Sequence, residues 1–313
     1  KGAKSLDALR DDVALHFRLV SLKGRDADST FIYDEAARTL VSKKINCLDR
    51  ASFRKLCEEE GWFIPLSVGA KRGVAIYTYE PRALPADIAL AAPEHTLDLQ
   101  DHFEGRLLRG DRSWNDVRDQ VRTFLSFELA QGPEIRLFLE APASIAFLAG
   151  KNLSLKSGAA VELVQAGYGN SRQVWDTHDH RPGPDPIVTE IAAGKGDDIA
   201  LVLSLARNAL PKVEQYVARA LPSVGKILHV TPVEGPALSA IRGGEHALRI
   251  AFLAAEAVSN TIAVKGKVHI FLSAPNALSF YLGQQAQLLG TCVLYEFDLL
   301  REIEGSYYPS FEA

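Results

Sequence analysis

The sequence contains no methionine, few cysteines and no long run of apolar residues. The three cysteines, Cys47, Cys57 and Cys292, are an odd number and lack the spacing of a zinc site, which fits a reducing compartment better than a disulfide framework. No apolar run approaches the roughly 18–20 residues of a membrane span, and no signal peptide opens the chain. The net charge of −4 gives no general attraction for nucleic acid. These absences predict a soluble cytoplasmic protein with no membrane partner.

Methionine is absent although about half a dozen would be usual at this length, and the first residue is Lys1. We therefore expect that residues are missing from this chain and that a further domain precedes it. The rest of the composition is ordinary for a globular protein, with 47% apolar and 24% charged residues. A chain of 313 residues can form two or three compact units with substantial cores.

Residues 135–155 (IRLFLEAPASIAFLAGKNLSL) and 268–288 (VHIFLSAPNALSFYLGQQAQL) follow one pattern. Each begins with a short apolar run, which is typical of a strand buried on both faces of a parallel sheet. An Ala-Pro pair then ends the strand, and helical periodicity follows up to a glycine that we expect to end the first helical turns. At an offset of 133 positions the copies share Phe138/Phe271, Leu139/Leu272, Ala141/Ala274, Pro142/Pro275, Phe147/Phe280, Gly150/Gly283 and Leu155/Leu288. Because ligands of such sheets bind beyond the carboxyl ends of the strands, the duplication predicts two turns that face one pocket.

The elements around each copy follow a similar order. We predict strands at 96–99, 160–165, 199–204, 226–231 and 291–296, and helices at 113–130, 213–220 and 246–263. This alternation indicates an α/β fold of two Rossmann-like halves, 95–186 and 197–313, within a domain that spans 89–313. Residues 176–186, rich in Pro and Asp, would join the halves.

Residues 1–88 differ from the rest of the chain and are predicted to form a small α+β segment. The expected elements are a helix at 6–19, a hairpin of 30–33 and 39–42 around Asp34-Glu35, a helix from Arg50 to about Glu60 and a strand at 74–79. The segment contains no recognisable catalytic motif. We interpret it as an accessory or effector-linking segment.

The sequence FLEAP…LAG and FLSAP…YLG occurs in register, each time at the head of a helix in a Rossmann-like half. In this the chain resembles a SAVED domain, the cyclic-nucleotide sensor module of bacterial anti-phage (CBASS) systems, which is built like two fused CARF domains. The resemblance covers roughly 95–313 and includes the loop 103–106 and the helix with Trp114.

The resemblance implies that the chain binds a cyclic di- or oligonucleotide second messenger, such as a cyclic trinucleotide, made by a partner nucleotidyltransferase (a CD-NTase). Binding would drive self-association and activate a fused effector, for which an HNH nuclease is the first hypothesis. DNA would be contacted only through that missing effector domain. We expect this chain to be non-catalytic and to need no metal or other cofactor.

The candidate ligand-binding residues lie near the expected carboxyl ends of strands and in the loops that follow. They are Phe103, Arg106, Pro142, Ala143, Ser144, Tyr168, Trp175, Ser204, Leu205, Arg207, Ser273, Ala274, Pro275 and Asn276. The N–H groups after each Ala-Pro turn would bind phosphate, and Ser144 or Asn276 would reach a phosphate or a base edge. Arg106 and Arg207 would each follow the first strand of its half and bind phosphate or stack on a base.

Each of these residues also has an ordinary structural interpretation. The Ala-Pro turns are consistent with plain helix starts, and the two arginines with solvated surface positions. Tyr168 and Trp175 either stack on purine bases or pack locally.

Two segments look like known motifs but lack the full pattern. The run His178-Asp179-His180 has too few ligands for a metal site, which favours a solvated linker. The run Gly194-Lys195-Gly196 lacks the rest of a phosphate-binding loop and is predicted to be a turn. Two other functions stay open, namely a ring nuclease or nucleotide hydrolase, and a ligand-controlled regulator that binds DNA through residues 1–88.

Overall fold

The computed structural model describes residues 32–45, 50–60, 71–79, 91, 93–166, 172–261, 266–298 and 307–313. The chain divides into two compact units. The first comprises Lys1–Ala70 with Leu155–Gly158, and the second comprises Lys71–Ser154 with Ala159–Ala313. Within the described ranges, no helix is both long enough and apolar enough to cross a membrane.

The first unit contains two α-helices among its described residues, α2 (Ile32–Ser42) and α3 (Arg50–Glu59). The helix predicted from Arg50 is confirmed, whereas the helix predicted at 6–19 lies outside the described residues. The predicted hairpin is wrong, because α2 runs through it without a break. A two-residue hairpin turn needs residues that readily adopt positive φ, which Asp34-Glu35 does not supply, while Glu, Ala and Arg in the same stretch favour a helix.

The first sheet of the second unit has the strand order β2-β1-β5-β6-β7. Its strands are β1 (Arg72–Tyr77), β2 (Thr96–Asp98), β5 (Glu134–Glu140), β6 (Ala160–Ala166) and β7 (Arg172–Trp175). The first four strands in this order are parallel, and β7 is antiparallel to β6. Two helices belong to this half, α4 (Trp114–Gln131), capped by Ser113 as predicted, and α5 (Ala143–Asn152).

The position of β1 changes where the second unit begins. This strand pairs with β2 on one side and with β5 on the other. The strand that we assigned to the N-terminal segment 1–88 is therefore an inner strand of the first sheet, and the second unit begins at Lys71. The prolines that follow at positions 81 and 85 made this strand look separate from the domain in the sequence.

The second sheet has the order β13-β12-β11-β9-β10-β8. Its strands are β8 (Ile187–Ala192), β9 (Asp198–Ser204), β10 (Val224–Thr231), β11 (Val268–Ser273), β12 (Cys292–Phe297) and β13 (Tyr307–Glu312). The four inner strands are parallel, and both edge strands are antiparallel to their neighbours. The helices are α6 (Leu210–Ala220), α7 (Gly244–Thr261), α8 (Asn276–Gln284) and α9 (Ala286–Leu289).

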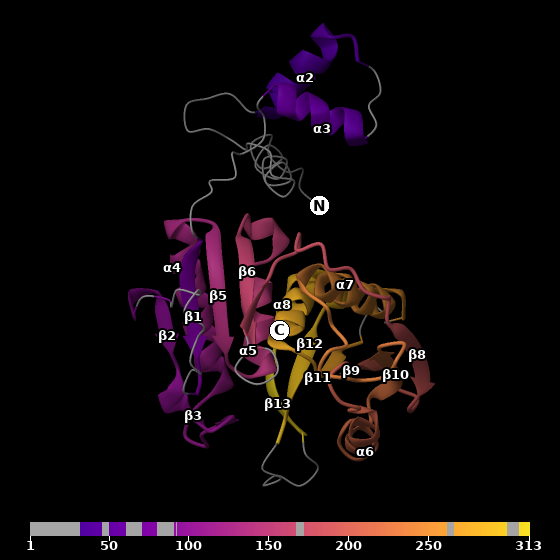
Figure 1. Cartoon of the computed structure of the whole chain (residues 1–313). Helices are drawn as coiled ribbons and strands as arrows, with labels where there is room; N and C mark the ends of the chain where they lie inside the picture. The colour runs from indigo at the N-terminus through magenta and orange to yellow at the C-terminus, as the bar shows by residue number, and fades with distance from the viewer. Residues whose placement is uncertain are drawn as a thin grey trace, which may run out of the picture. The chain divides into compact units, whose positions relative to one another are not determined.

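The two sheets are copies of each other. Read in one direction, β2-β1-β5-β6-β7 matches β10-β9-β11-β12-β13, and β8 is an additional strand at the edge. The helix before the copied strand is α4 in one half and α7 in the other, and the helix after it is α5 or α8. Figure 1 shows the two sheets side by side with α5 and α8 between them. The predicted α/β fold with two Rossmann-like halves is confirmed.

Helices α5 and α8 pack against each other through the duplicated glycines. A Cβ added to Gly150 would lie 1.8 Å from the Phe280 carbonyl oxygen, and one added to Gly283 would lie 2.0 Å from that of Phe147. These contacts are equivalent, because each joins the glycine of one copy to the phenylalanine of the other. The prediction that the glycines end the first helical turns is wrong, since α5 continues to Asn152 and α8 to Gln284.

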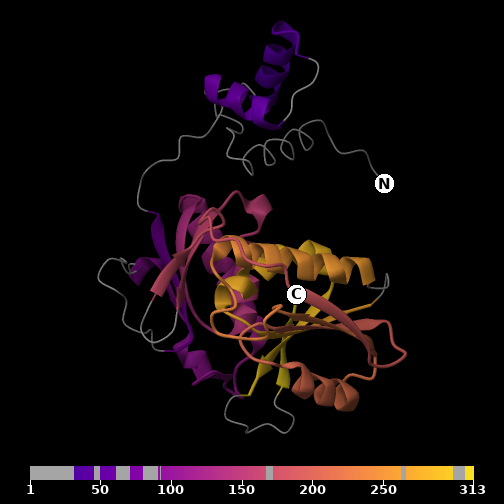
Figure 2. The same ribbon diagram turned by 45° about the vertical axis from the view of Figure 1, so that its right-hand side comes forward.

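The second sheet is covered on both faces, as the continuous apolar strands predict. Leu201 and Leu203 of β9 share a core cluster with Ile250 of α7. Ala200 and Val202 point the other way and pack with α6. Figure 2 shows α7 (orange) on one side of these strands and α6 on the other.

Candidate functional site

A cavity of about 460 Å³ lies between the two halves of the second unit, at the carboxyl ends of the strands. Its wall consists of Arg106, Ala141, Pro142, Ala143, Ala206, Arg207, Asn208, Ala209, Lys212, Leu272, Ser273, Ala274, Asn276, Glu296, Phe297 and Tyr307. This volume is in the range of small-molecule sites, and carboxyl ends of parallel strands are where α/β proteins bind ligands.

A smaller cavity of about 200 Å³ adjoins the first, because Arg106, Ala274 and Asn276 line both. The rest of its wall consists of Tyr79, Leu137, Leu139, Glu140, Leu163, Val164, Gln165 and Ala277. The two cavities thus meet at the start of α8. Together they form one composite site that both halves line.

The two Ala-Pro turns lie side by side at this site. Pro142 and Pro275 occupy the N-cap positions of α5 and α8. The Asn276 Nδ2 donates hydrogen bonds to the carbonyl oxygens of Leu139 (3.1 Å) and Ala141 (2.9 Å), so the second turn is bound to the backbone of the first. The duplicated breaks therefore meet in one place, as the sequence predicted.

Three cationic side chains line the larger cavity. Arg106 lies in the turn of a short hairpin of β3 (Phe103–Glu104) and β4 (Leu107–Leu108), where Gly105 adopts φ +60°. Arg207 follows β9, and its backbone N–H donates to the Ser273 Oγ at 3.1 Å. Lys212, which the sequence analysis missed, lies on α6. Arg106 follows β2, the second strand of its half, so its predicted placement after the first strand is wrong although it reaches the cavity.

Aromatic rings accompany two of these cations. The Arg106 guanidinium carbon lies 5.1 Å from the ring centroid of Tyr79, and the Lys212 Nζ lies 4.4 Å from that of Phe297. Both distances are within the range of cation–π contacts. Flat rings beside positive charge suit a ligand that has planar bases and phosphates.

Glu296, near the end of β12, places a carboxylate in the cavity wall that the three cations also line. Its Oε1 accepts a hydrogen bond from the backbone N–H of Ser144 at 2.7 Å. Burial raises the pKa of Glu296, against the opposing effects of Ser144 and of the Arg106 charge. Ionising Glu296 in the folded protein therefore costs more free energy than ionising a surface glutamate.

Half of the predicted site residues line the larger cavity, namely Arg106, Pro142, Ala143, Arg207, Ser273, Ala274 and Asn276. The others that the structure describes have structural contacts. Ser204 Oγ accepts from the Ala209 N–H at 3.0 Å, Leu205 is fully buried, and Ser144 Oγ lies 2.7 Å from Ser310 Oγ.

The predicted aromatic residues lie in the interior. Phe103 is 3% exposed and contacts Trp114 edge to face, with ring centroids 5.7 Å apart. Trp175 is 6% exposed and belongs to the main core cluster, which is the packing alternative of the sequence analysis. Tyr168 lies outside the described residues.

Several residues of the cavity wall were not predicted, including Tyr79, Gln165, Lys212, Glu296 and Phe297. The sequence pattern could have indicated three of them. Gln165 ends the strand predicted at 160–165, Glu296 ends the one predicted at 291–296, and Phe297 directly follows it. The rule that selected the Ala-Pro turns applies equally to these strand ends.

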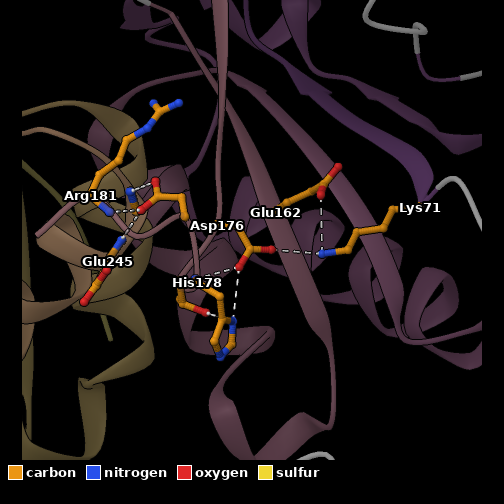
Figure 3. A network of polar contacts seen from close by, with 9 residues as sticks. Lys71, Glu162, Asp176, His178, Arg181 and Glu245 are labelled. Atoms are coloured by element: carbon orange, nitrogen blue, oxygen red, sulfur yellow. Dashed lines mark hydrogen bonds and ion pairs between the residues drawn. The ribbon is translucent and has the colours of Figure 1, made fainter. Parts of the chain in front are cut away.

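A polar network holds the beginning of the segment that joins the halves (Figure 3). The Lys71 Nζ lies 3.2 Å from an Asp176 carboxylate oxygen and 3.4 Å from one of Glu162. The His178 N–H donates to the other Asp176 oxygen at 2.8 Å. Burial acts to raise the pKa of Asp176, but the hydrogen bonds from His178 and the charge of Lys71 outweigh it and lower the pKa.

The rest of this segment is bound to α7. Asp179 accepts hydrogen bonds from the N–H groups of Gly244 (2.6 Å) and Glu245 (3.3 Å), so a carboxylate from the joining segment caps α7. His178 is exposed, but the segment as a whole is docked, and the solvated linker was too simple a prediction. Among the described residues no group of three or more His, Cys, Asp or Glu side chains could hold a metal ion. Lys195 lies in the connection between β8 and β9, as predicted.

Two duplicated Rossmann-like halves with a composite cavity at their strand ends define a fused, CARF-like α/β protein with a candidate ligand site between its halves. The sequence profile of a known family matches residues 117–312, well over half of the chain. The chain belongs to this family, SAVED, the SMODS-associated and fused to various effectors sensor domain.

Individual relatives agree with this assignment. The CD-NTase-associated protein 4 of Enterobacter hormaechei subsp. hoffmannii (strain UCI 50) is 42% identical over 311 residues, which cover 98% of this chain and 62% of the relative. The chain thus spans less than two thirds of that protein.

Solved structures have the same fold at low identity. The Acinetobacter baumannii Cap4 SAVED/CARF-domain containing receptor with the cyclic trinucleotide 2'3'3'-cAAA matches with a TM-score of 0.53 at 16% identity, over 82% of this chain and 53% of that one. The same receptor with 3'3'3'-cAAA matches with a TM-score of 0.50 at 17% identity, over 77% of this chain and 52% of that one.

Proposed function

We propose that this chain is a sensor that binds a cyclic oligonucleotide in the composite cavity. The observation that carries the proposal is that equivalent Ala-Pro turns of both halves meet at one cavity, which is lined by Arg106, Arg207 and Lys212. The relatives support it, since the Acinetobacter receptors were solved with cyclic trinucleotides. The CD-NTase in the name of the Enterobacter relative supports a nucleotidyltransferase as the source of the ligand.

The cavity offers a partner for each part of such a ligand. Arg106 and Arg207 would bind phosphate oxygens, for which the planar guanidinium is well suited. The rings of Tyr79 and Phe297, each beside a cation, would stack on bases. Tyr168, outside the described residues, remains a candidate for the same role.

A cytoplasmic location and an effector fused to the sensor complete the proposal. Ligand binding would drive self-association of the sensor and activate a nuclease in the part of the full-length protein that this chain does not span, and only that part would contact DNA. The N-terminal unit would then link effector and sensor. The chain itself would carry out no catalysis.

Calorimetry with a panel of cyclic di- and trinucleotides tests the binding step. We expect saturable binding of at least one cyclic nucleotide (below, the ring). Arg207→Ala should weaken this binding about tenfold or more, because a hydrogen bond from a charged guanidinium to phosphate is lost. Arg122→Ala, an exposed position on α4, is the control and should bind as the wild type does. If the folded protein binds no ring of the panel, the proposal is wrong.

Self-association is tested separately by light scattering of the chain with and without the ring that binds. We expect the mass to rise on addition of ligand. A mass that stays constant at saturation contradicts ligand-driven assembly and leaves the binding proposal standing.

A further inference from the structure

The helices that follow the Ala-Pro turns are capped by side chains from the opposite half. The Ser144 N–H at the start of α5 donates to Glu296 Oε1 of β12 at 2.7 Å. The Ala277 N–H at the start of α8 donates to Gln165 Oε1 of β6 at 2.9 Å. Each half therefore supplies the acceptor for the first turn of the other half's helix.

These two caps occupy equivalent positions. The capped residues, Ser144 and Ala277, correspond at the offset of the duplication. The register that pairs Phe138 of β5 with Val164 of β6 pairs Phe271 of β11 with Tyr295 of β12. In each outer strand the next residue is the one that caps the opposite helix. The two halves thus make the same capping contact with different side chains. The cap is the acid Glu296 in the second half and the amide Gln165 in the first.

The two side chains offer a ligand different chemistry. Glu296 lines the larger cavity and Gln165 the smaller one. An ionised carboxylate only accepts hydrogen bonds and has about four acceptor positions, of which the backbone uses one here. A neutral amide accepts through its oxygen and donates through its NH₂ group.

Capping alone does not account for the charge of Glu296. Gln165 makes the same contact without a charge, at nearly the same distance. Burial raises the pKa of Glu296, so the ionised form has a cost at this position. A negative charge among Arg106, Arg207 and Lys212 also weakens the attraction for phosphate. Ionised Glu296 thus costs folding free energy and weakens phosphate binding. A ligand contact that requires a hydrogen-bond acceptor would explain why an acid occupies this position.

We propose that Glu296 determines specificity, in that its carboxylate accepts a hydrogen bond from the amino edge of one nucleobase of the ligand. This inference rests on the proposed function, and it deepens it by assigning a base with an amino group to the subsite of Glu296. Gln165 at the equivalent position carries no charge, so a symmetric ring would meet different side chains in the two halves.

The test compares two rings by calorimetry, cyclic tri-AMP and an analogue in which every adenine is replaced by purine, which lacks the amino group. We expect the wild type to prefer cyclic tri-AMP by roughly 10- to 100-fold, the usual effect of a hydrogen bond to a charged group. Glu296→Gln retains an acceptor for Ser144 and should lose most of this preference. Glu256→Gln, exposed on α7, should keep it.

The possible outcomes separate this proposal from the function on which it rests. If wild type and Glu296→Gln show the same preference, Glu296 does not read the amino group, and the sensor function stands. If the wild type binds neither ring nor any other cyclic nucleotide, the sensor function fails and this proposal with it. Should Glu296→Gln not fold, Glu296→Asp decides instead. Its carboxylate keeps the charge but is one methylene shorter, so we expect it to lose most of the preference for cyclic tri-AMP, and an unchanged preference would overturn the proposal.

Discussion

At the scale of single residues, the charges around the cavity oppose one another. Arg106, Arg207 and Lys212 suit an anionic ligand, whereas Glu296 does not. The folded protein tolerates this acid because the Ser144 N–H and the Arg106 charge act against the effect of burial. The ionisation of Glu296 should therefore measurably change the free energy of unfolding of the ligand-free protein.

Glu296 should make stability depend on pH. Its folded pKa lies above the ordinary value of 4.5, so the folded protein binds the proton more tightly than the unfolded chain does. The free energy of unfolding should fall as pH rises from 4.5 toward the raised pKa and level off above it. Glu296→Gln removes this titration, so the stability of the variant relative to the wild type should increase from acid to neutral pH. Urea denaturation at a series of pH values measures this difference.

The exposed Glu256→Gln serves as the control for this series, because its difference from the wild type should stay nearly constant with pH. If the difference in unfolding free energy between Glu296→Gln and the wild type also stays constant with pH, burial does not raise the pKa of Glu296 as we infer.

At the scale of elements, the contact between α5 and α8 requires glycine, which has no side chain, at positions 150 and 283. The backbone of each helix occupies the place where a Cβ on the other helix's glycine would be. An added methyl group would meet a carbonyl oxygen on the opposite helix, so it could be accommodated only if the helices moved apart.

Gly150→Ala and Gly283→Ala should each destabilise the second unit by about 2 kcal/mol or more, as overpacking does in well-packed interiors. This loss exceeds the gain of about 1 kcal/mol that alanine brings to a helix. Gly110→Ala is the matched control, since nothing lies within 4 Å of its added Cβ. Urea denaturation of the three variants gives the comparison. Equal stability of Gly150→Ala and Gly110→Ala would show that the helices do not need the close approach.

The sequence predicted individual elements well where periodicity was strong. The strands of both copies, α4 with its Ser113 cap and the two turns at Pro142 and Pro275 all follow from local pattern. Periodicity could not say whether Gly150 ends a helix or lies inside a helix contact, because that depends on a partner 130 residues away. Edge strands β8 and β13 were missed because their partner strands, and not their own pattern, define them.

At the scale of the whole molecule, duplication explains both the fold and the site. Because the halves repeat one strand order, the carboxyl ends of both sheets carry equivalent turns, and these turns meet where α5 and α8 pack. The two halves and the meeting of their turns could be predicted from the sequence, because the repeat is visible in it. The exchanged caps of Glu296 and Gln165 were not predictable, because each joins a strand of one half to a helix of the other.

The central claim is that one ligand is bound by both halves at once. Arg106 comes from the first half and Arg207 from the second, and both line the same cavity. Calorimetric stoichiometry of Arg106→Ala and Arg207→Ala with the same cyclic oligonucleotide tests the claim most directly. We expect one cyclic oligonucleotide per chain in the wild type and a similar loss of affinity, about tenfold or more, in each variant. Two independent sites per chain, with each substitution weakening only one of them, would contradict it.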